Sequence, residues 1–287
     1  ITISPLNKEV KTMKGEIEVA NIESEILEIP FKPIGRLIGV PVEVNDEKQV
    51  FIFDSGSPKV ILNTNYHKSN SNHTISNTES ATGAITGMDI YKLKYLNFGG
   101  IEIKNQEVLA MDLSHIEKEH NTQIHGLIGY EVFKGYDIIY DYNKQIITLA
   151  KPKSINSIVK GKSKSQTDFA MSGHLPVLTA TIGGKTLNFG LDSGAESNLL
   201  DIQYYTKLKE SFTYLEKVRM TGANKKTSLV HKVTLDTLQL GDAFFSNTLT
   251  LFSDISHLNS SNASKIDGLL GHPILSKQIT VVSYTRK

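Results

Sequence analysis

The sequence predicts an all-β protein built from two similar lobes. Short segments rich in Val, Ile, Leu, Phe and Tyr recur between turn residues, a pattern typical of β-strands. The chain has 287 residues, enough for two domains, because a single core stops growing at about 250–300 residues. The two halves also resemble each other in sequence. We therefore expect a bilobal fold of two homologous β-barrel-like lobes related by a pseudo-twofold axis.

The strand candidates are separated by turn residues that tolerate a positive backbone dihedral. Such turns are predicted at Asn45-Asp46, Gly99-Gly100, Gly183-Gly184 and Gly241-Asp242. The predicted strands include Leu37 to Val44, Val50 to Phe53, Ile138 to Tyr142, Ile146 to Leu149, Leu187 to Leu191 and Ile279 to Val282. The best helical candidates are short: Leu200 to Glu210, and turns beginning near Glu131 and Pro273.

A segment rich in lysine and serine, residues 151–168, has little apolar periodicity and is interpreted as a solvated linker. It separates an N-terminal lobe of residues 30–150 from a C-terminal lobe of residues 169–287. Residues 1–29 precede the first lobe. They form either a pro-segment whose lysines cover the site or strands of a sheet between the lobes, and the alternation over Ile17 to Ile29 favours strands.

The internal repeat is defined by five landmarks in the same order. Phe51 to Gly56 (FIFDSG) matches Phe189 to Gly194 (FGLDSG) at an offset of 192 − 54 = 138 residues. The other landmarks are Ile61-Leu62 with Leu199-Leu200, Thr82-Gly83-Ala84 with Thr221-Gly222-Ala223, Asp112-Leu-Ser114 with Asp254-Ile-Ser256, and Gly126 to Gly129 with Gly268 to Gly271. The offset grows only from 138 to 142, so the halves differ by short loop insertions. The repeat indicates a duplicated lobe.

Composition excludes several classes of function. The 31 basic and 30 acidic residues nearly balance, so a polyanionic partner such as nucleic acid is not indicated. There are no cysteines, which excludes disulfides, thiolate metal sites and cysteine nucleophiles. No apolar run is long enough for a transmembrane segment. Neither a GxSxG elbow nor a phosphate-binding loop occurs.

The duplicated aspartates carry the most informative chemistry. Asp54 and Asp192 each end an apolar strand and enter a Gly turn, where an unpaired carboxylate would be costly. If the lobes pack about a twofold axis, the two carboxyls lie side by side and share a proton. One member can then take a proton from water while the other hydrogen-bonds a carbonyl oxygen. We expect peptide hydrolysis without a covalent intermediate and without a cofactor.

The two Asp-Ser-Gly turns, each followed by a hydrophobic-hydrophobic-Gly signature, resemble the pepsin/retropepsin superfamily. The signatures are Leu127-Ile128-Gly129 and Leu269-Leu270-Gly271. The spacings, 129 − 54 = 75 and 271 − 192 = 79 residues, are closer to a retropepsin-sized lobe. The chain is most similar to bacterial retropepsin-like aspartyl proteases with two fused lobes. The resemblance implies a pepsin-like acid protease fold over almost the whole chain, with Asp54 and Asp192 as catalytic residues of an aspartic endopeptidase.

The same resemblance assigns roles to the neighbouring residues. Ser55 and Ser193 supply hydroxyls that interlock the two turns, and Gly56 and Gly194 suit a tight turn whose backbone amides point at the carboxyls. The substrate-covering flaps correspond to Thr82, Gly83 and Ala84 in the first lobe and to Thr221, Gly222 and Ala223 in the second. A Thr-Gly-Ala hairpin without a lid role is the alternative. No tyrosine of the pepsin type stands next to Gly83, and this departs from the pepsins.

The two turns differ at the third position after the aspartate, where Ser57 stands in the first and Ala195 in the second. A serine hydroxyl can donate to a carboxylate and favour its ionisation, whereas alanine cannot. This difference predicts that Asp54 is the ionised partner and Asp192 the protonated one.

Three other interpretations of the sequence have less support. His115, His120 and His125 are spaced by five, which places them on different faces of a helix and disfavours a metal site. A catalytically silent module that binds peptides in a pepsin-like cleft is the main alternative to an enzyme. A glycosidase also uses two carboxylates, but its acids need not lie in duplicated turns, and tryptophan is absent.

The expected partner is a peptide or protein substrate, and one chain supplies the whole site, so a monomer is sufficient. The first residue is not methionine, which suggests a processed product and an extracytoplasmic location: periplasmic, secreted or surface-anchored. Lysine exceeds arginine by 28 to 3, and asparagine is frequent, as in proteins encoded by AT-rich bacterial genomes.

Overall fold

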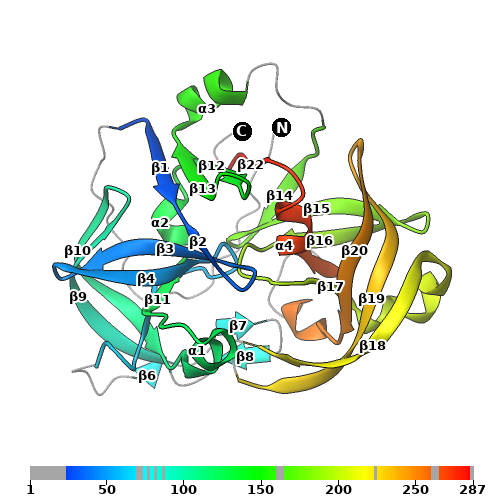
Figure 1. The fold of residues 1–287 in the computed structure, drawn as a ribbon, viewed down its shortest axis with the longest axis horizontal. Coiled ribbons are helices and arrows are strands. Elements are labelled where there is room, and N and C mark those ends of the chain that lie inside the picture. Colours follow the sequence, from blue (N-terminus) through cyan, green and yellow to red (C-terminus); the bar gives the residue numbers. More distant parts are fainter. Residues whose placement is uncertain are drawn as a thin grey trace.

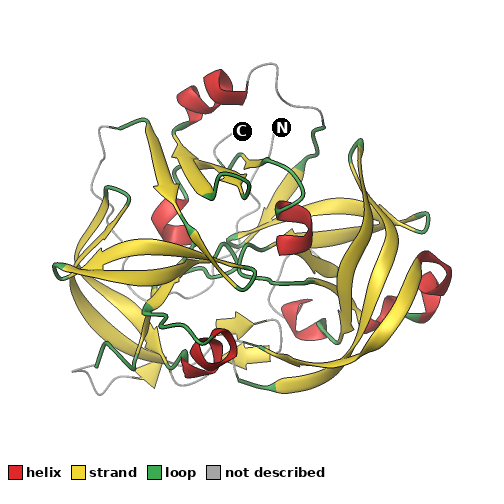
Figure 2. Cartoon of the chain, viewed as in Figure 1, coloured by secondary structure: helices red, strands yellow, loops and turns green. Residues whose placement is uncertain are grey.

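The computed structural model describes residues 24–68, 74–75, 78–80, 83–85, 88–159, 165–222, 225–259 and 265–284. Over these residues the protein consists of two β-sheet lobes with a smaller sheet between them (Figure 1). Strands dominate both lobes, and the helices are short and lie at their margins (Figure 2). The predicted all-β, bilobal, pepsin-like fold is confirmed.

The first lobe is one eight-stranded sheet in the order β2-β3-β4-β11-β5-β10-β9-β6. A further pairing of β3 with β9, at Glu43 with Asn97 and Val44 with Leu96, closes six of these strands into a barrel. A separate two-stranded ribbon is formed by β7 (Thr78–Ser80) and β8 (Gly83–Ile85). The strands of the sheet are β2 (Lys32–Ile34), β3 (Leu37–Val44), β4 (Glu47–Phe53), β5 (Ile61–Asn63), β6 (Thr74–Ile75), β9 (Met88–Phe98), β10 (Ile101–Met111) and β11 (Gly126–Ile128).

The second lobe repeats this order strand for strand, as β14-β15-β16-β21-β17-β20-β19-β18. The pairing that corresponds to the closure of the first lobe joins β15 to β19 at Thr181 and Gln239. Its strands are β14 (Phe169–Ser172), β15 (Leu175–Ile182), β16 (Lys185–Leu191), β17 (Asn198–Asp201), β18 (Phe212–Thr221), β19 (Thr227–Leu240), β20 (Ala243–Ser253) and β21 (Gly268–Leu270). The sequence repeat is therefore a repeat of topology.

A four-stranded sheet lies between the lobes in the order β1-β13-β12-β22. Its strands are β1 (Ile26–Pro30), β13 (Ile146–Ala150), β12 (Asp137–Asp141) and β22 (Thr280–Val282). Three strands flank the first lobe in sequence, and the fourth follows the second lobe and pairs with β12 at Ile138 and Val282. β1 comes from the segment predicted to be either an interlobe strand or a pro-segment, and residues 1–23 lie outside the described residues.

The hairpin turns form where turn residues were predicted. Asn45 and Asp46 adopt φ of 49° and 70°, and Gly183 and Gly184 adopt φ of 54° and 73°. These pairs join β3 to β4 and β15 to β16, the same two strands in each lobe. A two-residue turn with positive φ at both positions matches the natural twist of a hairpin. Such turns set the register of β4 and β16, which end directly before Asp54 and Asp192.

The helices are α1 (Ser114–His120), α2 (Tyr130–Phe133), α3 (Pro152–Val159) and α4 (His272–Leu275), with 3₁₀ turns η1 (Ile202–Tyr204), η2 (Thr206–Ser211) and η3 (Ser256–Asn259). The segment interpreted as a linker thus contains α3, whose Ile155 is fully buried against Ile139 and Ala150. The prediction of a helix over Leu200 to Glu210 is wrong. Leu200 lies in β17, where it pairs with Phe252 of β20, and only 3₁₀ turns follow.

Buried aromatic side chains fill the centre of the first lobe and extend toward the sheet between the lobes. The ring of Phe53 lies 4.7 Å from that of Phe133, 5.9 Å from that of Phe98 and 6.2 Å from that of Tyr140. Phe189, the counterpart of Phe51, is likewise buried in the second lobe. Since Phe53 directly precedes Asp54, this packing holds the end of the strand that carries the aspartate.

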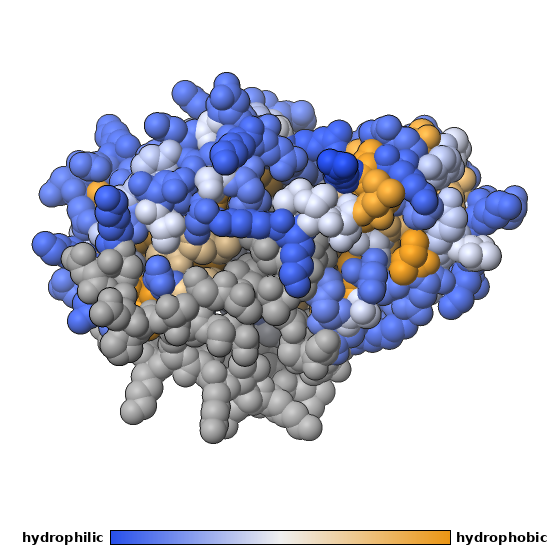
Figure 3. Space-filling model, turned by 90° about the horizontal axis from the view of Figure 1, so that it is seen from below, coloured by the Kyte–Doolittle hydropathy of each residue, from blue (hydrophilic) through white to orange (hydrophobic). Residues whose placement is uncertain are grey.

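The surface of the molecule is mostly hydrophilic, but apolar patches appear on the side formed by the second lobe (Figure 3). Exposed large apolar residues of this lobe include Leu215, Leu229 and Phe244. Within the described residues, none of the helices has the length and apolar character needed to cross a bilayer.

Truncating a core aromatic should test this assignment of the second-lobe interior. Phe189 is 1% exposed and Phe244 is 65% exposed. We expect Phe189→Ala to lower the free energy of unfolding by about 3–5 kcal/mol, and Phe244→Ala to change it by no more than about 0.5 kcal/mol. Equilibrium denaturation of both variants measures this. Equal effects would contradict the assignment.

Candidate active site

The two aspartates stand at equivalent strand ends, each held by a neighbouring parallel strand. The amide of Asp54 donates to the carbonyl of Ile128 (3.0 Å), and that of Asp192 donates to the carbonyl of Leu270 (2.9 Å). Ile128 and Leu270 belong to β11 and β21, which run parallel to β4 and β16. The duplicated hydrophobic-hydrophobic-Gly signature therefore supports the backbone from which each carboxyl projects.

The two Asp-Ser-Gly turns are joined by a reciprocal pair of buried hydrogen bonds, which we call the serine interlock. The amide of Ser55 donates to Oγ of Ser193, and the amide of Ser193 donates to Oγ of Ser55, both at 2.9 Å. Oγ of Ser193 also donates to the carbonyl of Phe53 (3.1 Å). Each hydroxyl thus accepts from the opposite lobe, as the resemblance to retropepsins implied for Ser55 and Ser193.

Asp54 and Asp192 form a carboxyl pair across the junction of the lobes. Their side chains hydrogen-bond each other, and each lies against the glycine of the opposite turn. A Cβ atom added to Gly56 would overlap the carboxyl of Asp192, and one added to Gly194 would overlap that of Asp54. Only glycine at both positions leaves room for the pair, so the sequence pattern Asp-Ser-Gly follows from the close approach.

Backbone amides surround the pair. The amides of Gly56 (2.9 Å) and Ser57 (3.2 Å) donate to Oδ1 of Asp54, and the amide of Gly194 donates to Oδ1 of Asp192 (2.8 Å). The amide of Gly56 also hydrogen-bonds Asp192. Hydrogen bonds from amides stabilise the charged form of a carboxyl group. These donors therefore offset part of the cost of removing the carboxylate oxygens from water.

Both carboxyls are harder to ionise than an ordinary aspartate. Burial raises the pKa of Asp54 well above its ordinary value of 3.8, and the negative charge of Asp192 raises it further. Burial also raises the pKa of Asp192. Two carboxyls in contact titrate as one unit and retain a shared proton over a range of pH. The pair can therefore present an acid and a base at the same time.

The hydroxyl of Ser57 does not act as predicted. It donates to the carbonyl of Lys59 (2.9 Å), and only the Ser57 amide reaches Asp54. The prediction that Asp54 is the ionised partner and Asp192 the protonated one depended on that hydroxyl. The structure therefore gives this prediction no support. The amides of Ser57 (3.2 Å) and Ala195 (3.3 Å) both donate to the main-chain carbonyl of their own aspartate. The turns differ because the Ser57 amide also donates to Oδ1 of Asp54.

The predicted flaps are only partly within the described residues. Thr82 and Ala223 lie outside them. Gly83 and Ala84 belong to β8, which pairs with β7. Thr221 ends β18 and pairs with Thr227, and the amide of Gly222 donates to the carbonyl of Lys226 (3.0 Å). Both segments are hairpins, and their role as substrate-covering flaps stays a prediction.

The tip of the β18–β19 hairpin reaches the first lobe near α1 (Figure 1). Nζ of Lys225 lies 2.6 Å from Oδ2 of Asp112, just before that helix. The hydrogen bond from Lys225 lowers the pKa of Asp112. Asp254 stands at the equivalent place in the second lobe, and both aspartates accept the amide of the serine two residues on. This ion pair connects the hairpin of one lobe to the body of the other.

The three histidines considered as metal ligands do not converge. Nδ1 of His125 accepts from the amide of Val50 (3.3 Å), and His115 is partly buried. Of the three histidines, only His120 belongs to a possible ligand set, together with Glu119 and Glu196. Each of these residues offers one ligand atom, and the three atoms lie within 4.8 Å of one another. Glu196 accepts the amide of Arg36 (2.8 Å) and lies 3.5 Å from His120, so contacts within the protein account for its carboxylate.

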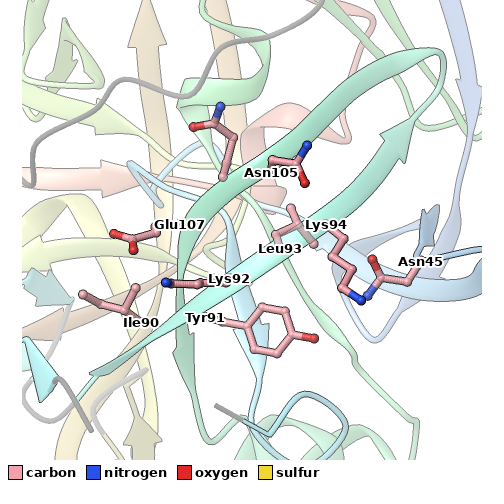
Figure 4. A pocket seen from close by; sticks show the side chains of 9 residues that line it. Asn45, Ile90, Tyr91, Lys92, Leu93, Lys94, Asn105 and Glu107 are labelled. Atoms are coloured by element: carbon pink, nitrogen blue, oxygen red, sulfur yellow. The ribbon is translucent and has the colours of Figure 1, made fainter. Parts of the chain in front are cut away.

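A surface hollow outside the junction of the lobes lies along β9 and β10 (Figure 4). It contains neither Asp-Ser-Gly turn and shows no carboxyl pair. Its lining mixes charged, amide and apolar side chains: Asn45, Ile90, Tyr91, Lys92, Leu93, Lys94, Asn105, Gln106 and Glu107. We assign it no role in the chemistry of the aspartates.

Sequence reasoning missed the residues that pack beneath the turns. Tyr140 hydrogen-bonds the side chains of Ser55 and Ser193, and burial raises its pKa. His174 contacts the carbonyl of Gly56, and Arg36 contacts Glu196. The repeat offered a signal for the last two, because 174 − 138 = 36 places His174 and Arg36 at equivalent positions before the repeated strands.

This geometry defines a bilobal aspartic-type site in which each lobe supplies one carboxyl. The family model described as "Aspartyl protease" matches residues 40–132 and 178–274, one segment in each lobe. The chain belongs to this family, which is retropepsin-like. A comparison with curated proteins found no match.

The raised pKa values predict how the pair affects stability. A carboxyl whose folded-state pKa exceeds its unfolded-state value stabilises the fold most at low pH, and this contribution is lost as pH rises through the folded-state pKa. We therefore expect Asp54→Asn to gain stability relative to the wild type between about pH 3.5 and about pH 7. Equilibrium denaturation across this range measures the difference in the free energy of unfolding between the variant and the wild type, with the exposed Asp236→Asn as control. A difference that does not change with pH would contradict the raised pKa values.

The contact of Ser57 gives a second prediction. Because its hydroxyl donates to Lys59, Ser57→Ala keeps the amide that reaches Asp54. We expect the acid limb of the pH–rate profile for peptide cleavage to stay within about 0.2 pH units of the wild type. An upward shift of the limb would instead support the hydroxyl contact that the sequence predicted.

Proposed function

We propose that the protein is an aspartic endopeptidase that hydrolyses peptide bonds with a water molecule activated between Asp54 and Asp192. Membership of the aspartyl protease family supports peptide substrates. The observation that carries the proposal is the contact of two partly buried carboxyls, from two lobes, inside one chain. Because one chain supplies both, a monomer is sufficient.

In the proposed reaction, the ionised carboxyl takes a proton from the water as the water oxygen attacks the peptide carbon. The protonated carboxyl hydrogen-bonds the carbonyl oxygen and transfers its proton as the tetrahedral gem-diol forms. The C–N bond then breaks as the protonated carboxyl gives its proton to the leaving amine. One hydroxyl of the gem-diol passes its proton to the other carboxylate as the product carboxylic acid forms, so the pair again holds one proton. No covalent enzyme intermediate is formed. The reaction needs only the shared proton and the fixed positions of the two carboxyls.

The serine interlock and the backbone amides support this role by fixing the carboxyls before substrate binds. A catalytic group must be held within a fraction of an ångström for efficient proton transfer. Buried hydrogen bonds at 2.9 Å between the turns restrict their relative movement. The hairpin β18–β19, held to the first lobe through Lys225 and Asp112, would cover an extended peptide at the junction.

The test is cleavage of a peptide library by the wild type, Asp54→Asn and Asp192→Asn. We expect each substitution to lower kcat/KM by at least about 10³-fold, because it removes an acid or base of the pair. A statine-type inhibitor should abolish wild-type cleavage, since its hydroxyl mimics the tetrahedral intermediate.

Asp236→Asn serves as the control, because this exposed aspartate of β19 lies outside the site. Cleavage that survives substitution of either aspartate of the pair would reject the mechanism. Peptide binding without cleavage by the wild type would instead assign a peptide-binding module with a pepsin-like cleft.

A further inference from the structure

One histidine reaches from the second lobe to the aspartate turn of the first. His174 lies in the turn between β14 and β15, and its Nε2 is 2.7 Å from the carbonyl oxygen of Gly56. A carbonyl can only accept, so Nε2 carries the hydrogen. The imidazole is partly buried, and the ring of Tyr130 lies 6.4 Å from it.

The accepting carbonyl belongs to the peptide group that touches the carboxyl pair. The carbonyl of Gly56 and the amide of Ser57 are the two ends of one peptide group, and this amide donates to Oδ1 of Asp54 (3.2 Å). An amide whose oxygen accepts a hydrogen bond is polarised and donates more strongly through its N–H. The imidazole, peptide group and carboxyl therefore form one chain of hydrogen bonds from His174 to Asp54.

The equivalent contact of the other lobe has a different target. Arg36 occupies the position that corresponds to His174, and its amide donates to Oε1 of Glu196 (2.8 Å). Its guanidinium donates to the main-chain carbonyl of Glu196 (3.4 Å). Glu196 lies four residues beyond Asp192, outside the Asp-Ser-Gly turn. The chain of hydrogen bonds thus acts on the first turn and makes the two halves of the site unequal.

We propose that His174 is a positioning residue that stabilises negative charge on the carboxyl pair through the Gly56–Ser57 peptide group. The contact lowers the pH at which activity begins, because it opposes the effect of burial and eases loss of the first proton from the pair. For its kinetic readout, this inference rests on the proposed peptidase function. The hydrogen-bond chain itself exists independently of catalysis.

The chain of hydrogen bonds persists in both protonation states of His174. Burial lowers the pKa of the imidazole, and its hydrogen bond to Gly56 opposes that effect. The neutral ring donates from Nε2, and the protonated ring donates from the same atom with an added positive charge. Tyr130 is a titratable group whose ring lies near this imidazole, and burial raises its pKa, so it is uncharged near neutral pH.

Two variants separate the donor from the shape of the ring. His174→Phe keeps an aromatic ring without a donor, and His174→Gln keeps an N–H donor without a ring. We expect the acid limb of kcat/KM to move upward by about half a pH unit in His174→Phe and to remain near the wild type in His174→Gln. Asp236→Asn, which changes an exposed aspartate outside the site, provides the reference for the position of the limb.

A second measurement does not depend on activity. Titration of the ¹³C-labelled aspartate carboxyls by NMR in the full chain, with the pair assigned through Asp54→Asn and Asp192→Asn, reports the pair directly. We expect its first ionisation to occur at higher pH in His174→Phe. If this variant does not fold, as judged by near-UV circular dichroism, His174→Leu replaces it.

The outcomes distinguish this inference from the proposed function. A limb and a carboxyl titration that are both unchanged in a folded variant without the donor would overturn the role of His174, even if the wild type cleaves peptides. A shifted carboxyl titration in a chain that cleaves nothing would reject the peptidase function and support the role of His174.

Discussion

The serine interlock is the contact on which the rest of the site depends. Each of Ser55 and Ser193 donates its amide to the hydroxyl of the other, and both side chains are almost fully buried. An unpaired buried amide costs about 1–3 kcal/mol. Both serine amides find their acceptors only when the two turns are in this relative position. That position brings two carboxyls into contact and leaves space for glycine alone at Gly56 and Gly194. The chemistry of the pair follows from the packing of the turns.

Duplication explains why such a close contact can be built at all. The two lobes share one strand order, so the same strand end and the same supporting signature recur on both sides of the junction. The small differences between the lobes then decide how the pair behaves. His174 and Arg36 stand at equivalent positions but contact different atoms. A nearly symmetric scaffold therefore carries a carboxyl pair whose two members have unequal surroundings.

Much of the fold was predictable because its signals are local or repeated. Strand β3 coincides with the predicted Leu37 to Val44, and the turns at Asn45 and Gly183 have the positive φ that their residues favour. The pairing of Asp54 with Asp192 followed from the repeat, since equivalent positions meet across a twofold axis. Local patterns failed at Leu200, where burial between two neighbouring strands outweighs helical periodicity.

Side-chain direction was the other limit of prediction. Ser57 could have donated to the carboxyl or to a carbonyl, and only the folded turn shows that Lys59 receives the bond. Tyr140 lies 86 residues beyond Asp54 in the chain and reaches the serines from β12 of the sheet between the lobes. Contacts of this kind depend on three-dimensional packing, which residue spacing does not contain.

The sheet between the lobes links the two halves of the chain in an order that the sequence sets. Its strand β22, Thr280–Val282, is made after every other described strand, yet it pairs with β12 of the first half. The first lobe and Asp54 are therefore synthesised before the strand that completes the sheet between the lobes. Formation of this sheet requires segments from both halves of the chain, as formation of the carboxyl pair does.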